Sequence, residues 1–518
     1  MQILRTDCLV IGAGLAGSAY ALQAARLGLK VELLSLSEPL AANSDWAQGG
    51  IIYEPNGGAE VLARDIFEAS DRTANPVAVE HLVREGPTAV QELLLDELHV
   101  GFDRSESGEL HLTREGGHSE RRIIHAKDTT GHAILSAIAA RVDHTPNISR
   151  RAGCVAIDLL TLSHTSNDLA DRYLPLTCFG AYVLDTATGE TVAIIAKKTI
   201  LATGGLGQIF LHSTNQPGSV GHGVAMAYRV GARLIDLEYV QFHPTVFAKK
   251  NAPRFLVTEA LRGEGAMLLN ARGHRFMDTL DPRGSLASRD VVARAIKQEL
   301  AATGEACVYL DLSAMTSEFI RDRFPTIYQR CLQHGVDITT DPIPVVPAAH
   351  FACGGVHADL NGRTSVRHLN AIGETGCTGL HGANRLASTS LLECLVSAKF
   401  AALTDGTDIA RETFRLPEPP EWESPTREAD PVLIRQDMQQ IQHTMWNYAG
   451  VVRSPKRLTR ARRILSELSE EIQTFYQGCR PTRELIDLRN AVQTALLVVH
   501  AASLNPHSRG CHFVTEEP

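Results

Sequence analysis

The chain opens with a hydrophobic pattern that is typical of a nucleotide-binding α/β unit. An apolar run at 4–11 predicts a buried parallel strand, an alanine-rich stretch at 15–27 predicts a helix, and 30–35 predicts a second strand. The turn between the first strand and the helix reads Gly12-Ala13-Gly14-Leu15-Ala16-Gly17. In this context the glycines let backbone N–H groups approach a pyrophosphate, although a turn with nothing bound has the same pattern.

The same kind of pattern returns several times along the chain. Helical spacing covers 59–99, with an interruption expected near Pro87, and it covers 131–142. Apolar strands are predicted at 152–158, 177–185 and 191–201, and the last one ends in a second glycine turn. Near 369–373 a short strand precedes Glu374, and an apolar helix follows at 391–400. A carboxylate at the end of a parallel strand is suited to accept hydrogen bonds from ribose hydroxyls.

The pattern also divides the chain. From 234 to 345 the hydrophobic pattern no longer matches alternating buried parallel strands and helices. This change predicts an inserted domain between the two parts of a discontinuous domain, 1–233 and 346–415. A stretch rich in Pro and Glu at 416–431 predicts a linker. Helical spacing with mixed charge at 432–449, 455–477 and 481–502 predicts a helical bundle within a last domain, 432–518.

Composition narrows the function classes. The hydrophobic content of 44% and charged content of 21% are typical of a soluble globular protein. The net charge of −9 argues against a nucleic-acid partner, and no apolar run has the length of a membrane span. The ten cysteines form no CxxC pair, so no metal centre is predicted. We therefore expect a cytoplasmic protein that binds neither nucleic acid nor membranes.

Several long motifs point to one family. The run GLHGANRLASTSLLEC at 379–394, AIGE at 371–374 and PAAHFACGG at 347–355 resemble the flavoproteins of the succinate dehydrogenase/fumarate reductase family, and the resemblance extends along nearly the whole chain. The resemblance implies an α/β fold: a Rossmann-like FAD-binding domain, an inserted α+β capping domain over 234–345, and a C-terminal three-helix bundle.

The resemblance implies FAD as the cofactor. Family members that bind the flavin covalently use a histidine where this chain has Asn43, so non-covalent FAD is expected. Ser35 replaces the acid that usually ends the second strand, and its hydroxyl can still bond a ribose. The expected FAD-binding residues are Gly12, Gly14, Ala16, Gly17, Ser35, Ser44, Ala47, Gln48, Gly49, Gly50, Ala202, Thr203, Gly204, Gly373, Glu374, Asn384, Ser390 and Leu391.

The same resemblance implies a site for a dicarboxylate. Arg289 corresponds to the family's catalytic arginine, which exchanges a proton with the substrate, and it needs a carboxylate such as Glu259 or Glu264 as a relay. The expected substrate-binding residues are Glu115, His243, Thr258, Glu259, His350 and Arg385. Taken singly, each has an ordinary structural explanation: a helix ion pair for Arg289, a core hydrogen bond for each histidine, and a surface turn for Glu115.

Two reactions are compatible with these residues. The residues of the 347–355 motif, Asn43 and Glu115 favour the branch of the family that oxidises L-aspartate to iminoaspartate. The resemblance implies that this reaction is the first step of de novo NAD biosynthesis and that O2 or fumarate reoxidises the flavin. That reaction implies a functional link to quinolinate synthase, which consumes the product. The alternative is a succinate dehydrogenase or soluble fumarate reductase. A flavin-binding protein without turnover is a third interpretation, which leaves the set of arginines and histidines unexplained.

Overall fold

The computed structural model describes residues 1–37, 41–54, 58–166, 168–250 and 252–516. Its centre is a sheet whose strand order is β6-β2-β1-β9-β8-β7, with β16 also paired to β9. The strands are β1 (Gln2–Ile11), β2 (Val31–Leu34), β6 (Ile148–Arg151), β7 (Cys154–Thr161), β8 (Cys178–Asp185), β9 (Thr191–Leu201) and β16 (Leu369–Ala371). The strands β6, β2, β1, β9 and β16 run parallel, and β8 pairs antiparallel with both β9 and β7. The predicted apolar strands are thus buried neighbours in one sheet.

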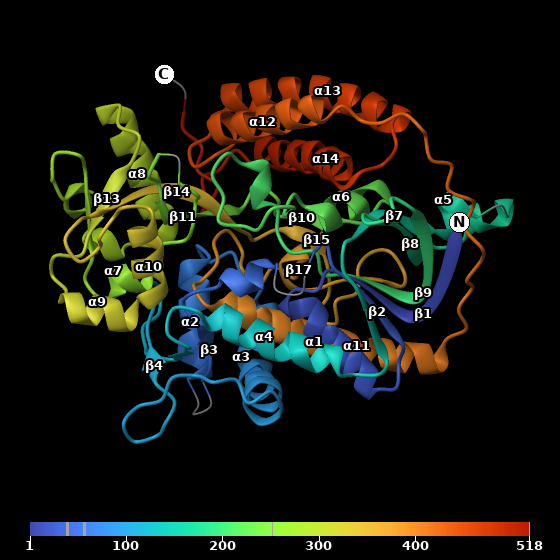
Figure 1. Ribbon diagram of the computed structural model, residues 1–518, viewed down its shortest axis with the longest axis horizontal. Helices are drawn as coiled ribbons and strands as arrows, with labels where there is room; N and C mark the ends of the chain where they lie inside the picture. The colour runs from blue at the N-terminus through green and yellow to red at the C-terminus, as the bar shows by residue number, and fades with distance from the viewer. Residues whose placement is uncertain (38–40, 55–57, 167, 251, 517–518) are drawn as a thin grey trace.

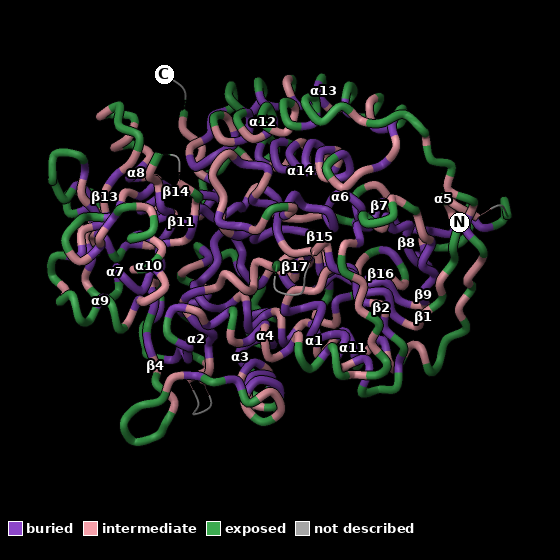
Figure 2. The backbone as a smooth tube through the Cα atoms, in the orientation of Figure 1, coloured by how far each residue is buried: buried purple, intermediate pink, exposed green. Residues whose placement is uncertain are grey.

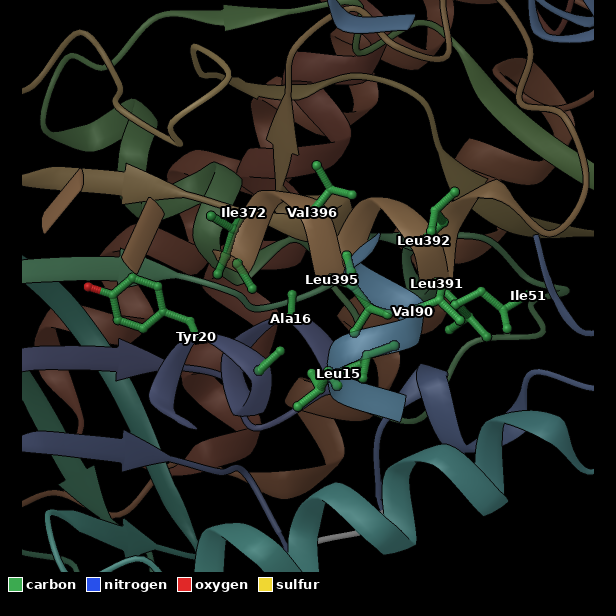
Figure 3. Close-up of a cluster of buried hydrophobic side chains, with 14 of the residues drawn as sticks. Leu15, Ala16, Tyr20, Ile51, Val90, Ile372, Leu391, Leu392, Leu395 and Val396 are labelled. Carbon is green, nitrogen blue, oxygen red and sulfur yellow. The ribbon is translucent and has the colours of Figure 1, made fainter. Parts of the chain in front are cut away.

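Helices cover one face of this sheet (Figure 1). They are α1 (Leu15–Arg26), α2 (Ala59–Ala69), α3 (Pro76–Ala89), α4 (Thr130–Asp143) and α11 (Thr389–Arg411). Leu15 and Ala16 of α1 share a hydrophobic core with Leu391 and Leu395 of α11 (Figure 3). The beginnings of two helices far apart in sequence are therefore packed together beside the strand ends. A small sheet of β3 (Ile51–Ile52), β5 (Ile123–Ile124) and β4 (Leu112–Thr113) lies at the edge of this layer.

The predicted interruption of the helix near Pro87 was placed wrongly. Helix α3 continues through Pro87 and passes into a π-helix at Val90–Glu97. The break lies earlier, between Ser70 and Asn75, where Asp71 and Arg72 both have φ of 57° and the Asn75 side chain accepts a hydrogen bond from the Val77 N–H. A proline inside a helix removes one donor, and the wider π turn that follows is a known way to accommodate such a local defect.

A second, antiparallel sheet has the order β11-β14-β13-β12. It consists of β11 (Val240–Phe247), β14 (Ile343–Ala352), β13 (Val308–Asp311) and β12 (Met267–Leu269), with helices α7 (Ala260–Gly263), α8 (Arg289–Thr303), α9 (Ser317–Arg323) and α10 (Pro325–Gln333) around it. Its core is separate from that of the central sheet. Strand β14 runs across residue 345, where the sequence predicts the end of the capping domain, and the exact domain division stays a prediction.

Three long helices form the C-terminal part: α12 (Pro431–Tyr448), α13 (Pro455–Gly478) and α14 (Arg483–Leu504). Each begins with a side-chain cap, from Asp430, Ser454 and Thr482 respectively. Figure 2 shows α14 largely buried, with α12 and α13 outside it. The chain from 412 to 430 has no helix or strand, and the last two residues of the predicted domain lie outside the described residues.

Short elements complete the chain. They are α5 (Leu162–Thr165), α6 (His222–Arg229), a three-stranded sheet of β10 (Leu234–Ile235), β15 (Gly355–His357) and β17 (Gly376–Cys377), and 3-10 helices at Asn43–Trp46, Leu169–Tyr173, Gly207–Ile209, Phe276–Thr279, Gly284–Leu286 and Gly373–Thr375. Within the described ranges, no helix combines the length and apolar character that crossing a bilayer requires.

Candidate functional site

The first glycine turn brings two strand ends into contact. Gly12 has φ of 114°, and a Cβ there would lie 2.2 Å from the Ala202 carbonyl oxygen at the end of β9. A Cβ at Gly17 would lie 1.9 Å from the Gly12 carbonyl oxygen. Both positions therefore require glycine, the first for the turn and the second for close packing of α1 on the strand end.

A cavity of about 790 Å³ lies against this turn. Of the residues predicted to bind FAD, it is lined by Gly12, Gly14, Ala16, Ser35, Ser44, Ala202, Thr203, Gly204 and Glu374. It continues into a second cavity of about 910 Å³, because Asn43, Ser44, Glu374 and Cys394 line both. The N-terminus of α1, which can bind an anion, lies at the first cavity, and the two cavities adjoin, so the residues present fit FAD.

The second cavity collects the other predicted residues. Ala47, Gln48, Gly49, Gly50, Ser390 and Leu391 of the predicted FAD set line it. So do all seven residues predicted for substrate and catalysis: Glu115, His243, Thr258, Glu259, Arg289, His350 and Arg385. They come from strands β11 and β14, helix α8 and three loops, so the structure brings together side chains spread over most of the chain.

Three predicted FAD-binding residues lie outside both cavities. Gly17 packs behind the turn, as described above. Gly373 has φ of 58°, and a Cβ there would lie 2.8 Å from the Ala16 side chain, so it also permits close packing. Asn384 donates to the Ala69 carbonyl oxygen at 2.9 Å and accepts from Gln241 at 2.6 Å. The structure gives these three residues supporting positions, and their contact with the cofactor stays a prediction.

Two irregularities in the β11–β14 ladder aim the histidines. Gln241 pairs with Phe351 but Phe242 pairs with Ala349, which makes His350 an extra residue in β14. A second shift follows His243 in β11. Bulges of this kind redirect side chains beside active sites. The two imidazole rings lie 5.2 Å apart between centroids, and both line the second cavity.

Arg289 and Arg385 of the second cavity are held by two side chains, the Glu259 carboxylate and the Gln241 amide. Arg289 Nε donates to Glu259 at 2.6 Å, and Glu259 also pairs with Arg262 at 3.0 Å. Burial disfavours the charge on Glu259, but Arg289 and Arg262 outweigh it and lower its pKa to about 2. Glu264, the other carboxylate expected as a relay, is exposed, whereas Glu259 contacts Arg289 directly.

Gln241 is a functional candidate that the sequence analysis did not single out. It is fully buried, and its Oε1 accepts from Arg289 at 3.1 Å and from Arg385 at 3.3 Å. Because Gln241 is a neutral amide, it bonds to both guanidiniums without adding a negative charge beside them. Its position two residues before His243 was the available signal, but its two long-range partners could not be predicted from the sequence.

The hydrogen-bond donors around the second cavity suit a ligand with two carboxylates. Burial and the neighbouring arginines lower the pKa of His243 and of His350 well below its ordinary value, so both rings are neutral N–H donors. His243 Nε2 and Arg385 Nε are buried without a hydrogen-bond partner among the described residues. Burial and repulsion from Arg289 lower the pKa of Arg385 to about 10, which still leaves it charged. An anion in the cavity would satisfy these donors.

Glu115 adds a carboxyl group to the lining of the same cavity. It accepts from Ser388 Oγ at 2.6 Å, and a Cβ at Gly49 would lie 1.9 Å from its carboxylate, so Gly49 leaves room for it. Burial raises the pKa of Glu115, although the attraction of Arg289 opposes the shift. Ser388 is thus a second residue that the sequence analysis missed.

Asn43 and Ser35 occupy two positions where the chain departs from the family pattern. Asn43 Oδ1 accepts from the Gln216 N–H at 2.7 Å and from Ser219 Oγ at 3.3 Å. Ser35 Oγ donates to the Ser37 carbonyl oxygen at 2.6 Å, and Ser35 still lines the first cavity. A bond from Ser35 to a ribose would compete with that local bond.

Comparisons with known proteins agree with this geometry. Residues 7–391 match the family model described as an FAD-binding domain, and 438–518 match the one described as the C-terminal region of fumarate reductase flavoproteins. A structure of E. coli quinol fumarate reductase has a TM-score of 0.88 at 27% identity and covers 100% of this chain and 92% of its own. The chain therefore belongs to the succinate dehydrogenase/fumarate reductase flavoproteins, and its fold is theirs.

Full-length relatives narrow the family. The L-aspartate oxidase of Pseudomonas aeruginosa is 44% identical over 534 residues, which cover 100% of this chain and 96% of the relative. The L-aspartate oxidase 1 of Ralstonia nicotianae is 44% identical over 522 residues, which cover 99% and 95%. Within the flavoproteins, the chain belongs to the L-aspartate oxidase family.

Proposed function

We propose that the chain oxidises L-aspartate to iminoaspartate with a bound FAD, which O2 or fumarate then reoxidises. The observation that supports this most is the charge pattern of the second cavity: Arg289, Arg385 and two neutral imidazoles line it, together with the carboxyl group of Glu115. L-Aspartate carries two carboxylates and one ammonium group, and this arrangement is complementary to it. Direct transfer to quinolinate synthase would protect the unstable imine product.

The proposed binding mode divides the work between two groups of side chains. Arg385 grips one carboxylate through its fork, and His350 donates to the same end of the substrate. His243, whose buried Nε2 lacks a partner among the described residues, donates to the other carboxylate together with Thr258. Glu115 pairs with the ammonium group. Holding both ends orients one substrate C–H bond, which lowers the entropic part of the barrier.

Bound FAD would accept the hydride from that C–H bond. The oxidation also releases one proton from the substrate, and Arg289 is the proposed carrier: it would take that proton as it passes one of its own to Glu259. Its bond of 2.6 Å to Glu259 provides a route for the proton, and Glu259 in turn contacts Arg262. Among the described residues that line the second cavity, the other arginine is Arg385, which is assigned to a substrate carboxylate, and there is no lysine.

The test of this function is a spectral titration. Adding L-aspartate to the FAD-loaded protein without oxygen should bleach the yellow flavin within a turnover, and adding fumarate should restore the colour. Succinate in place of aspartate should bleach it far more slowly. Rapid bleaching by succinate and none by aspartate would favour the succinate dehydrogenase alternative.

FAD is expected to be bound without a covalent link. Asn43 stands where a flavin-linking histidine would be, and its amide oxygen is already engaged by Gln216 and Ser219. Acid precipitation of the loaded protein should release all the flavin into the supernatant. A pellet that kept flavin fluorescence on a denaturing gel would contradict this expectation.

A further inference from the structure

A loop without an assigned role, Ser213–Ser219, runs along both cavities. Thr214 and Asn215 line the cavity that contains His350, and residues 216–219 line the cavity beside Gly12. We call this segment the bracing loop. It is a wall that the cofactor space and the substrate space have in common.

The bracing loop begins beside the bulge in β14. The Ala349 N–H donates to the His212 carbonyl oxygen at 2.9 Å, and the Thr214 N–H donates to the Ala349 carbonyl oxygen at 3.0 Å. His350, the extra residue of the bulge, follows directly. Because an extra residue has no ladder partner to fix its side-chain direction, that direction depends on contacts outside the ladder.

Two side chains of the bracing loop supply those contacts. Thr214 Oγ1 lies 2.8 Å from His350 Nδ1, much closer than its alternative acceptor, the Ala349 carbonyl oxygen at 3.4 Å. Asn215 Nδ2 donates to the His350 carbonyl oxygen at 3.0 Å, and Asn215 Oδ1 accepts from the Gly207 N–H at 2.9 Å. The ring and the backbone of His350 are thus both tied to the loop.

The far end of the loop is tied to Asn43. Its side-chain oxygen accepts from the Gln216 N–H at 2.7 Å and from Ser219 Oγ at 3.3 Å. The loop is therefore anchored at one end to the segment that lines the cofactor space and at the other to the strand that carries His350.

We propose that Thr214 is a positioning residue, whose hydroxyl donates to Nδ1 of His350 and thereby presents Nε2–H to a substrate carboxylate. A neutral imidazole that accepts at Nδ1 carries its only proton on Nε2. Burial and the positive charges of Arg385 and Arg289 lower the pKa of His350, which keeps the ring neutral. The identity of the ligand rests on the proposed function, but the geometry of the ring does not.

The test replaces Thr214 by valine, which keeps the shape and removes the hydroxyl. Without that donor, Nδ1 is buried without a partner and the ring is free to change tautomer. KM for L-aspartate is expected to rise roughly 10-fold, the effect of one buried hydrogen bond, while kcat falls much less. Thr214→Ser keeps the hydroxyl and should restore KM. FAD content should be equal in all three proteins.

A second measurement reads the ring directly. In substrate-free, FAD-loaded protein labelled with 15N-histidine, the His350 signals are those that disappear in His350→Gln. They should report an accepting Nδ1 and a protonated Nε2 in the parent protein, and a mixture of tautomers in Thr214→Val. Because no substrate is present, this result is independent of whether aspartate is the substrate.

Three outcomes would overturn the proposal. One is an unchanged His350 tautomer in Thr214→Val. Another is a KM that Thr214→Ser does not restore. The third is loss of FAD from Thr214→Val, because the hydroxyl would then hold the loop together and not the ring. If aspartate failed to reduce the parent protein while the nitrogen signals changed as expected, the proposed function would fail and the role of Thr214 would stand.

Discussion

Replacing Arg289 by leucine is expected to abolish aspartate oxidation while FAD stays bound. Arg289 lines the second cavity and bonds to Glu259 at 2.6 Å, whereas the glycine turns that form the first cavity lie on other elements. Loss of a proton-transfer group typically reduces a rate by about 10²–10⁴-fold. The same variant should lose fumarate reduction, because the residue proposed to carry a proton away from aspartate would also have to deliver one to fumarate. Stopped-flow reduction of the flavin measures the first and reoxidation by fumarate the second.

Arg294 on the same helix offers a matched control. It pairs with Asp290 at 2.9 Å and does not line the second cavity, so Arg294→Leu removes a comparable ion pair away from the reacting atoms. Its kcat is expected to stay near that of the parent protein. If Arg289→Leu also retained near-normal rates on both substrates, Arg289 would be a structural partner of Glu259 and the proton would travel elsewhere.

Changing Glu115 to glutamine is expected to invert the substrate preference. Aspartate differs from succinate by one ammonium group, and the two arginines and two histidines cannot distinguish the two ligands. The Glu115 carboxylate can, because it would pair with the ammonium but stand unmatched against succinate or fumarate. An unmatched partner of a buried charge pair costs roughly 2–5 kcal/mol. Glu115→Gln should therefore lose most of its aspartate kcat/KM and keep or gain activity on fumarate.

Burial of Glu115 makes this substitution informative. Burial raises the pKa of its carboxyl group. Glutamine keeps the size of the side chain, removes its charge and can still accept a hydrogen bond from Ser388. Glu120→Gln is a suitable control, because that side chain lies on the same loop, is half exposed and faces Arg122 at 3.7 Å. An equal loss of kcat/KM on aspartate and fumarate in Glu115→Gln would mean that Glu115 only shapes the loop and that another group recognises the ammonium.

The elements that depend on neighbours in sequence were predictable. The strand, glycine turn and helix at 2–26, the strands of the central sheet and the three C-terminal helices occur close to the predicted positions. Pro87 was the exception, since the helix tolerated a missing donor by widening into a π turn. Hydrophobic period and turn chemistry act over a few residues, so the chain carries that information locally.

The residues around the second cavity were predictable as a set but not as a network. Family motifs named the seven charged and polar side chains. That Gln241 bridges Arg289 and Arg385, that Asn384 supports Gln241, and that Thr214 contacts His350 were not predictable, because each contact joins residues far apart in the chain.

The amino-acid sequence by itself determined the dinucleotide turn, the order of elements, the absence of histidine at position 43 and the types of side chain available for catalysis. Tertiary structure alone decided their chemical state. The pKa of Glu259 is lowered to about 2 while that of Glu115, also a buried carboxyl group, is raised. The difference arises because Glu259 lies against two guanidiniums, whereas Glu115 bonds to a neutral serine. Desolvation and Coulomb energy depend on distance and burial, and only the folded chain sets those.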